Sequence, residues 1–150
     1  MEYILAIDEG TSSTRAMLYS TQGDLVKSSQ YSLTQFYPEP GWVEHDPEEI
    51  WEKTFNAVND VIKSVDVTKI RACGITNQRE TTVIWDKKTN KCLAPAIVWQ
   101  DRRTNEFCET LSDDTQLIRD KTGLLPDPYF SATKLRWLLE NVPEARKLAG

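Results

Sequence analysis

Residues that bind transition metals or form disulfides are scarce in this chain of 150 residues, which has one histidine and three cysteines. The cysteines, Cys73, Cys92 and Cys108, form no C-x-x-C pair. Neither a zinc site nor a disulfide framework is therefore expected. The sequence also has no Asn-x-Ser/Thr glycosylation motif. Together these absences are typical of a protein of the reducing cytoplasm.

Basic charge, long apolar runs and glycine are also in short supply. Lys and Arg number 18 against 23 Asp and Glu, and the net charge of −5 argues against a nucleic-acid partner. No apolar run is long enough for an integral membrane segment. The six glycines lie far apart, and neither G-x-G-x-x-G nor G-x-x-x-x-G-K-S/T occurs, which excludes the two common glycine-rich nucleotide loops.

The N-terminal stretch combines two short apolar runs with a polar loop. Residues 3–7 and 16–19 predict buried strands. The eight residues between them include Asp8, Gly10, Arg15 and four consecutive hydroxyl side chains, Thr11, Ser12, Ser13 and Thr14. Gly10 permits close backbone approach, and the hydroxyls and Arg15 suit phosphate oxygens, while Asp8 could seat a hydrated Mg²⁺ ion. An ordinary solvated turn is the alternative interpretation.

The remaining pattern predicts an α/β fold of about one domain. A third strand over 25–33 would complete an antiparallel meander, and Asp46 followed by Pro47 predicts the start of a long amphipathic helix with its apolar face on the sheet. That face contains Ile50, Trp51, Thr54, Phe55, Val58, Val61, Ile62 and Val65. Further strands are predicted over 70–76, 81–86 and 93–99, and helices over 101–111, 113–121 and 131–141.

A second polar group follows the strand predicted at 70–76. Asn77, Gln78, Arg79 and Glu80 stand where a strand meets a loop, a common place for ligands in α/β sheets. Adjacent donors and acceptors suit a polyol, because each hydroxyl both donates and accepts a hydrogen bond. A surface ion pair is an equally good interpretation of these residues. Trp99 ends another strand and is either a core residue or an aromatic platform.

These segments resemble the N-terminal part of the FGGY carbohydrate kinase family, in particular its members that phosphorylate glycerol. The matching residues are 8–15 (DEGTSSTR), 40–47 (PGWVEHDP), 74–82 (GITNQRETT), 96–104 (AIVWQDRRT) and 127–131 (DPYFS). They occur in the family's order along nearly the whole chain. The first segment is shared with actin-like ATPases, whereas the third and fifth are more specific.

The resemblance implies an RNase H-like (actin-like ATPase) fold and ATP-dependent transfer of a phosphoryl group to glycerol, which would yield sn-glycerol 3-phosphate. It implies ATP and Mg²⁺ as cofactors, with Asp8 near the metal. The residues implied to contact the ATP phosphates are Thr11, Ser12, Ser13 and Arg15. Those implied to bind glycerol are Arg79, Glu80 and Tyr129, with Trp99 packing on its carbon atoms.

The chain departs from the family pattern in three respects. Glu9 stands where Gln is usual, and would have to point away from phosphate or pair with Arg15. Ala132 replaces a common Gly. Family members are much longer, and their catalytic aspartate and adenine-binding domain lie beyond position 150. We therefore expect an incomplete N-terminal domain, with no catalytic base and no kinase activity alone.

Two other functions are compatible with the same residues. One is an FGGY kinase for a longer sugar or polyol, and the other is a non-catalytic actin-like nucleotide-binding module. The module would not require the polyol segment at 74–82. Because family members often self-associate, a homo-oligomer is one expectation for the full-length protein.

Overall fold

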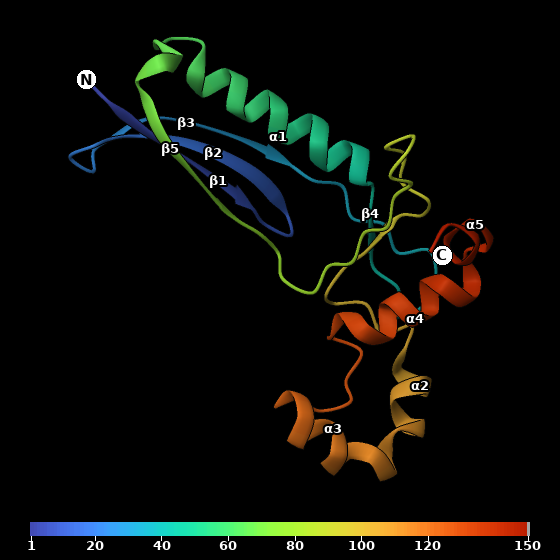
Figure 1. The fold of residues 1–150 in the computed structure, drawn as a ribbon. Helices are drawn as coiled ribbons and strands as arrows, with labels where there is room; N and C mark the ends of the chain where they lie inside the picture. The colour runs from blue at the N-terminus through green and yellow to red at the C-terminus, as the bar shows by residue number, and fades with distance from the viewer. Residues whose placement is uncertain (150) are drawn as a thin grey trace. The chain divides into compact units, whose positions relative to one another are not determined.

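The computed structural model describes residues 1–149, which form two compact units (Figure 1). Unit 1 contains Met1–Thr34 and Asp46–Gln78, and unit 2 contains Gln35–His45 and the chain from Arg79 onward. The phosphate-loop candidates belong to unit 1 and the polyol candidates to unit 2.

A four-stranded sheet forms the framework of unit 1. Strands β1 (Tyr3–Glu9), β2 (Ser13–Ser20) and β3 (Leu25–Ser32) make the expected antiparallel meander, and β5 (Ile70–Thr76) pairs parallel to β1. The strand order is β3-β2-β1-β5. The predicted mixed sheet with an antiparallel meander is thus confirmed.

Helix α1 (Pro47–Ile62) lies along one face of this sheet (Figure 1). Its predicted start is confirmed, because the Asp46 carboxylate accepts a hydrogen bond of 2.9 Å from the Glu48 amide and Pro47 takes the first helical position. Alternation along the strands directs every second side chain to the helix. The core that results contains Leu5, Ala16, Leu18, Ala57 and Val61.

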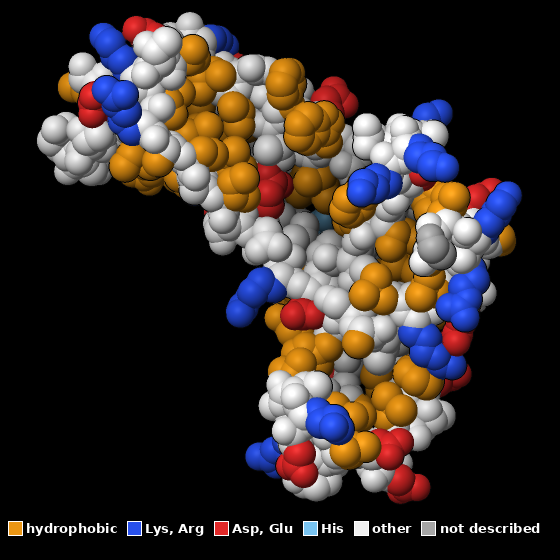
Figure 2. Space-filling view, viewed as in Figure 1, with side chains coloured by type: hydrophobic (Ala, Val, Ile, Leu, Met, Phe, Trp, Pro, Cys, Tyr) orange, Lys and Arg blue, Asp and Glu red, His pale blue; other side chains and the backbone are white. Residues whose placement is uncertain are grey.

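The predicted apolar face of α1 is wider than the face that the sheet covers. Trp51 and Phe55 are 68% and 54% exposed and stack on each other with ring centroids 6.1 Å apart. Apolar side chains are accordingly visible on the surface of unit 1 (Figure 2). Placing these two aromatics in the packed face was wrong: a helical repeat marks a broad stripe, and only its centre reaches the sheet.

Asp60 ties α1 to β3 and is expected to make unit 1 sensitive to acid. Its carboxylate accepts hydrogen bonds from Lys63 (2.8 Å), Tyr31 (2.8 Å) and Ser29 (2.9 Å). The bond from Lys63, followed by those from the two hydroxyls, lowers the pKa of Asp60 from 3.8 to about 2. A lowered pKa means that the stabilisation is complete above the ordinary value and is lost as the pH falls toward 2.

We therefore expect Asp60→Asn to flatten the pH dependence of unfolding between pH 3.8 and about 2. Circular dichroism during acid titration measures this slope. Asp113→Asn, at an exposed aspartate of another segment, is the matched control and should titrate as the wild type does. An unchanged slope in Asp60→Asn would show that this carboxylate does not couple folding to pH.

Unit 2 contains little regular sheet. Strand β4 (Glu44–His45) pairs antiparallel with β6 (Ala96–Ile97), and only isolated bridges join Thr82 to Ile97 and Trp85 to Cys92. The full strands predicted at 81–86 and 93–99 are therefore wrong. The helices of this unit are α2 (Asn105–Thr110), α3 (Thr115–Thr122), α4 (Ser131–Asn141) and α5 (Pro143–Leu148). Short 3-10 turns occupy Val67–Lys69 in unit 1 and Ser112–Asp114 in unit 2.

The three helices predicted in unit 2 are confirmed, two of them with changed limits. The first begins at Asn105 rather than at residue 101, and the second at Thr115 after a 3-10 turn, whereas α4 matches its predicted range. Helix α5 was not predicted. Pro143 occupies its first turn, so this proline starts a helix as well as ending the pattern before it.

A buried arginine forms ion pairs and cation–π contacts within unit 2. The Arg103 side chain is 2% exposed and lies 3.8 Å from the ring centre of Trp42 and 4.6 Å from that of Trp137. It donates to Asp101 (2.9 Å) and Glu44 (2.7 Å), while Asp101 also accepts the Val43 amide at 2.7 Å. The segments 40–47 and 96–104 therefore meet in one ion-pair cluster, which anchors the backbone next to Trp99.

Candidate functional site

The loop between β1 and β2 is shorter than predicted. Only residues 10–12 separate the two strands, so Ser13, Thr14 and Arg15 belong to β2. The Gly10 amide donates to the Ser13 carbonyl at 3.0 Å, and a Cβ at Gly10 would lie 3.0 Å from that oxygen. The turn is therefore tight enough to favour glycine at this position. The prediction of eight loop residues was wrong because polar side chains also occupy the exposed face of a strand.

Strand pairing places three of the phosphate candidates on one face of the sheet. Asp8 lies opposite Arg15 in the β1–β2 register, and Ser13 is two residues from Arg15. Because alternate strand residues share a face, Asp8, Ser13 and Arg15 are on the face away from α1, with Thr11 and Ser12 at the turn beside them. Gln30 of β3 bonds to both Arg15 (2.6 Å to Nη2) and Ser13 (2.9 Å).

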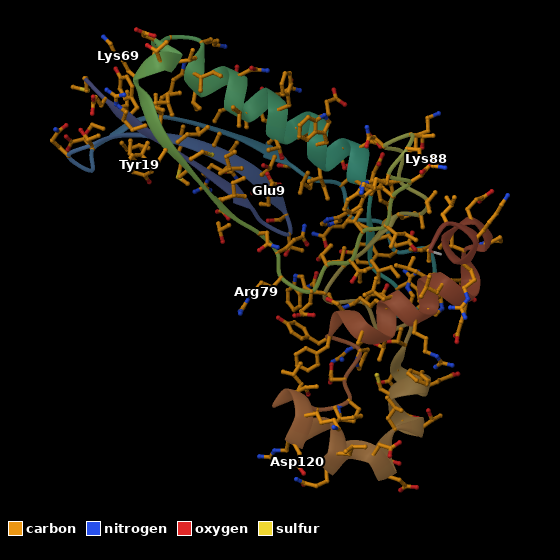
Figure 3. All side chains as sticks on the ribbon, viewed as in Figure 1. Glu9, Tyr19, Lys69, Arg79, Lys88 and Asp120 are labelled. Carbon is orange, nitrogen blue, oxygen red and sulfur yellow. The ribbon has the colours of Figure 1, made fainter. Side chains whose placement is uncertain are left out.

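Glu9 points to the opposite face. Its Oε1 accepts hydrogen bonds from Thr14 (2.8 Å) and from Thr54 of α1 (2.6 Å), and Oε2 is buried without a hydrogen-bond partner. Figure 3 shows Glu9 at the end of β1. Of the two arrangements considered for this carboxylate, the one that points away from the phosphate candidates Asp8, Ser13 and Arg15 is present. Glu9 and Thr14 fix the base of the loop to α1.

Hydrogen bonds hold the side chain of Glu80, a polyol candidate of unit 2. Its Oε2 accepts hydrogen bonds from the Ser131 amide (2.8 Å) and hydroxyl (2.7 Å). The hydroxyl bond outweighs the effect of burial and lowers the pKa of the Glu80 carboxyl, so the group is ionised near neutral pH. No hydrogen bond from the described residues reaches Oε1, which leaves this oxygen available as an acceptor.

The backbone of Glu80 is strained. Its φ of 66° lies in the left-handed region, which costs a residue other than glycine about 1 kcal/mol or more. Such conformations gather at functional sites, where the surrounding structure enforces them. The neighbouring Arg79 is exposed, and its side chain projects away from the ribbon (Figure 3).

Two aromatic candidates of unit 2 pack against each other. The rings of Trp99 and Tyr129 meet edge to face with centroids 6.0 Å apart, and Tyr129 also contacts Phe130 at 5.1 Å. The Tyr129 amide donates to Asp127 at 2.7 Å. Lys134 donates to the carbonyl oxygens of both Glu80 and Tyr129, so the structure brings these two candidates together. Sequence reasoning gave no role to Ser131 or Lys134.

Residues 1–149 contain neither a cluster of metal-binding side chains nor a membrane-spanning helix. No cluster of three or more His, Cys, Asp or Glu side chains with metal-binding geometry occurs there. Within the same range, every helix is too short or too polar to cross a membrane.

The chain matches the FGGY family of carbohydrate kinases, N-terminal domain, over residues 3–150. It belongs to this family. Glycerol kinase 1 of Saccharolobus solfataricus is 53% identical over 149 residues, covering 99% of this chain and 30% of the relative. The FGGY chain thus spans about 30% of the length of this relative.

Solved structures of FGGY kinases agree with this assignment. Plasmodium falciparum glycerol kinase with ADP superimposes with a TM-score of 0.92 at 41% identity, over 98% of this chain and 30% of that structure. A ligand-bound xylulose kinase from Lactobacillus acidophilus gives 0.88 at 25% identity, over 99% and 30%. The predicted family and its actin-like ATPase fold, here as part of a domain, are confirmed.

Proposed function

We propose that this chain is the N-terminal part of a kinase that transfers the γ-phosphoryl group of ATP to a terminal hydroxyl of glycerol. The observation that carries the proposal is the Glu80 carboxylate, which Ser131 holds through Oε2 while Oε1 stays available. Lys134 links the Glu80 main chain to that of Tyr129, whose ring packs on Trp99. Identity of 53% with a glycerol kinase across almost the whole chain favours glycerol over a longer sugar.

The residues of unit 2 suit a small polyol. Glu80 Oε1 would accept a hydrogen bond from one hydroxyl, and the exposed Arg79 guanidinium would donate to another. The Tyr129 phenol would add a third polar contact, and the indole of Trp99 would pack on the carbon atoms. These groups bind and orient the acceptor, which is the main requirement of phosphoryl transfer together with charge neutralisation.

The residues of unit 1 suit the phosphates. Arg15 would supply positive charge, and Thr11, Ser12 and Ser13 would donate hydrogen bonds to phosphate oxygens. One carboxylate, Asp8, fits Mg²⁺ held through water, since this ion keeps several waters and takes one or two carboxylates. Bound Mg²⁺ would neutralise charge on the ATP phosphates.

The proposal extends to the whole protein. The chain would form the first part of an RNase H-like N-terminal domain, and the rest of that domain and a C-terminal domain would supply the catalytic base and the adenine site. The isolated chain is then inactive. We place the enzyme in the cytoplasm, with no nucleic-acid partner. The runner-up is another FGGY sugar or polyol kinase, since the xylulose kinase shares this fold.

A chimera tests this function. The chain replaces the matched residues of the Saccharolobus glycerol kinase, and ADP release is measured with glycerol and with a panel of longer polyols and sugars. We expect turnover that depends on glycerol, and a roughly ten- to hundredfold loss of kcat/KM for glycerol in Arg79→Ala, because a charged hydrogen bond is removed. Arg119→Ala, at an exposed arginine of α3, is the matched control. ATP hydrolysis indifferent to every polyol would instead support a nucleotide-binding module.

A further inference from the structure

Lys134 is an unusual buried cation. Its side chain is fully buried in the first turn of α4, although lysine is rarely buried without a charged partner. The ammonium donates to two backbone carbonyl oxygens, that of Glu80 at 3.1 Å and that of Tyr129. No ion pair to Lys134 occurs among the described residues. Its partners are therefore two backbone dipoles and the Tyr129 ring, whose centroid lies 6.0 Å from Nζ, and these compensate an ammonium less than a carboxylate would.

Two physical terms oppose a lysine at this position. Burial disfavours the charged form and lowers the pKa of Lys134, in spite of the negative charges of Glu80, Asp101 and Asp127. A cation near a helix N-terminus also faces the positive end of the helix dipole. An apolar side chain of similar length would fill the space without either cost. Stability alone does not explain this residue.

The contacts of Lys134 explain the presence of a lysine at this position better than stability does. Glu80 has the left-handed φ of 66°, a conformation that persists only where neighbouring groups enforce it. Lys134 holds the Glu80 carbonyl, while Ser131, one helical turn earlier, holds the carboxylate through its amide and hydroxyl. The same ammonium holds the carbonyl of Tyr129, whose ring packs against Trp99. The buried ammonium of Lys134 thus fixes the main chain of Glu80, which carries the carboxylate, and that of Tyr129, which carries the phenol.

We propose that Lys134 is a positioning residue of the polyol site, which sets the placement of the Glu80 carboxylate relative to the Tyr129 ring through their main-chain carbonyls. This inference rests on the proposed function. It assigns to the first turn of α4 a part in recognising the acceptor, although Lys134 itself is buried and does not reach the ligand.

The test is Lys134→Met in the chimera described above. The methionine is similar in length and keeps the space filled, but it donates no hydrogen bonds. We expect KM for glycerol to rise roughly tenfold or more, with KM for ATP and Tm little changed or Tm raised. The matched control is Leu138→Ala, at a fully buried residue one turn further along α4, which should lower Tm but leave KM for glycerol as in the wild type.

The outcomes for the proposed function and for the role of Lys134 are distinguishable. A Lys134→Met enzyme whose KM for glycerol stays within about twofold of the wild type overturns the inference and leaves the proposed function standing. A wild-type chimera that phosphorylates no polyol overturns the proposed function, and the inference with it. If Lys134→Met does not fold, Lys134→Gln replaces it: its shorter side chain reaches at most one carbonyl, so an unchanged KM would again overturn the inference.

Discussion

Glu80→Gln is expected to lower kcat/KM for glycerol by about 10² to 10³, with the fold intact. The amide oxygen of glutamine can still accept the Ser131 amide at the place of Oε2, so the local structure is kept. The NH₂ group then occupies the position of Oε1, so the glycerol hydroxyl loses a charged acceptor and faces a hydrogen-bond donor instead. Steady-state kinetics of the chimera with glycerol and ATP varied in turn measures the effect.

The control for this substitution is Glu106→Gln, at an exposed glutamate of α2, which should leave both kinetic constants unchanged. The pH profile adds a second readout. Because the Ser131 hydroxyl lowers the pKa of Glu80 below its ordinary 4.5, the carboxylate should keep glycerol bound as the pH falls to that value. Ser131→Ala should move the acid limb upward. Wild-type kinetics in Glu80→Gln would exclude Glu80 from acceptor binding.

Local patterns predicted unit 1 well because its elements are specified by neighbouring residues. The start of α1 needs only Asp46 and Pro47, and the meander follows from short apolar runs joined by turns. The orientation of Glu9 could also have been predicted from the alternation of side chains along a strand. Glu9 lies four residues after Leu5 in β1 and therefore on the same face of the sheet. The exposure of Trp51 and Phe55 could not be predicted in this way, because it depends on where the sheet ends beneath α1.

The sequence predicted unit 2 less well because distant contacts determine its backbone. Asp101 accepts from Val43, and Arg103 donates to Glu44, and neither pair is close in sequence. These contacts replace the regular strands expected nearby. Prediction of the candidate site from the sequence is limited in the same way, by contacts between distant residues. Glu80 was proposed as a site residue from its own segment, whereas Ser131 and Lys134 bond to it from 51 and 54 residues away.

The second large effect concerns stability, and it is expected from Asp101→Ala. This substitution removes one of two carboxylates that pair with the buried Arg103 and also the acceptor of the Val43 amide. Removing one member of a buried ion pair costs about 3–5 kcal/mol, and here Glu44 alone is left to compensate Arg103 while the buried Val43 amide loses its acceptor. We expect the free energy of unfolding to fall by that amount in urea titration. Near-ultraviolet circular dichroism follows it, because Trp42 and Trp137 flank Arg103.

Arg102→Ala is the matched control, because the two arginines are adjacent in the chain and both pair with an aspartate at nearly the same distance. Arg102 lies 3.0 Å from Asp127 with both side chains about half exposed, whereas Arg103 lies 2.9 Å from Asp101 with both buried. Water screens the exposed pair, so its loss should cost less than about 1 kcal/mol. Equal effects of the two substitutions would mean that burial of Arg103 between the tryptophans does not strengthen its dependence on Asp101. A large difference would show that burial makes the Arg103–Asp101 pair, and with it the contact between segments 40–47 and 96–104, important for the stability of unit 2.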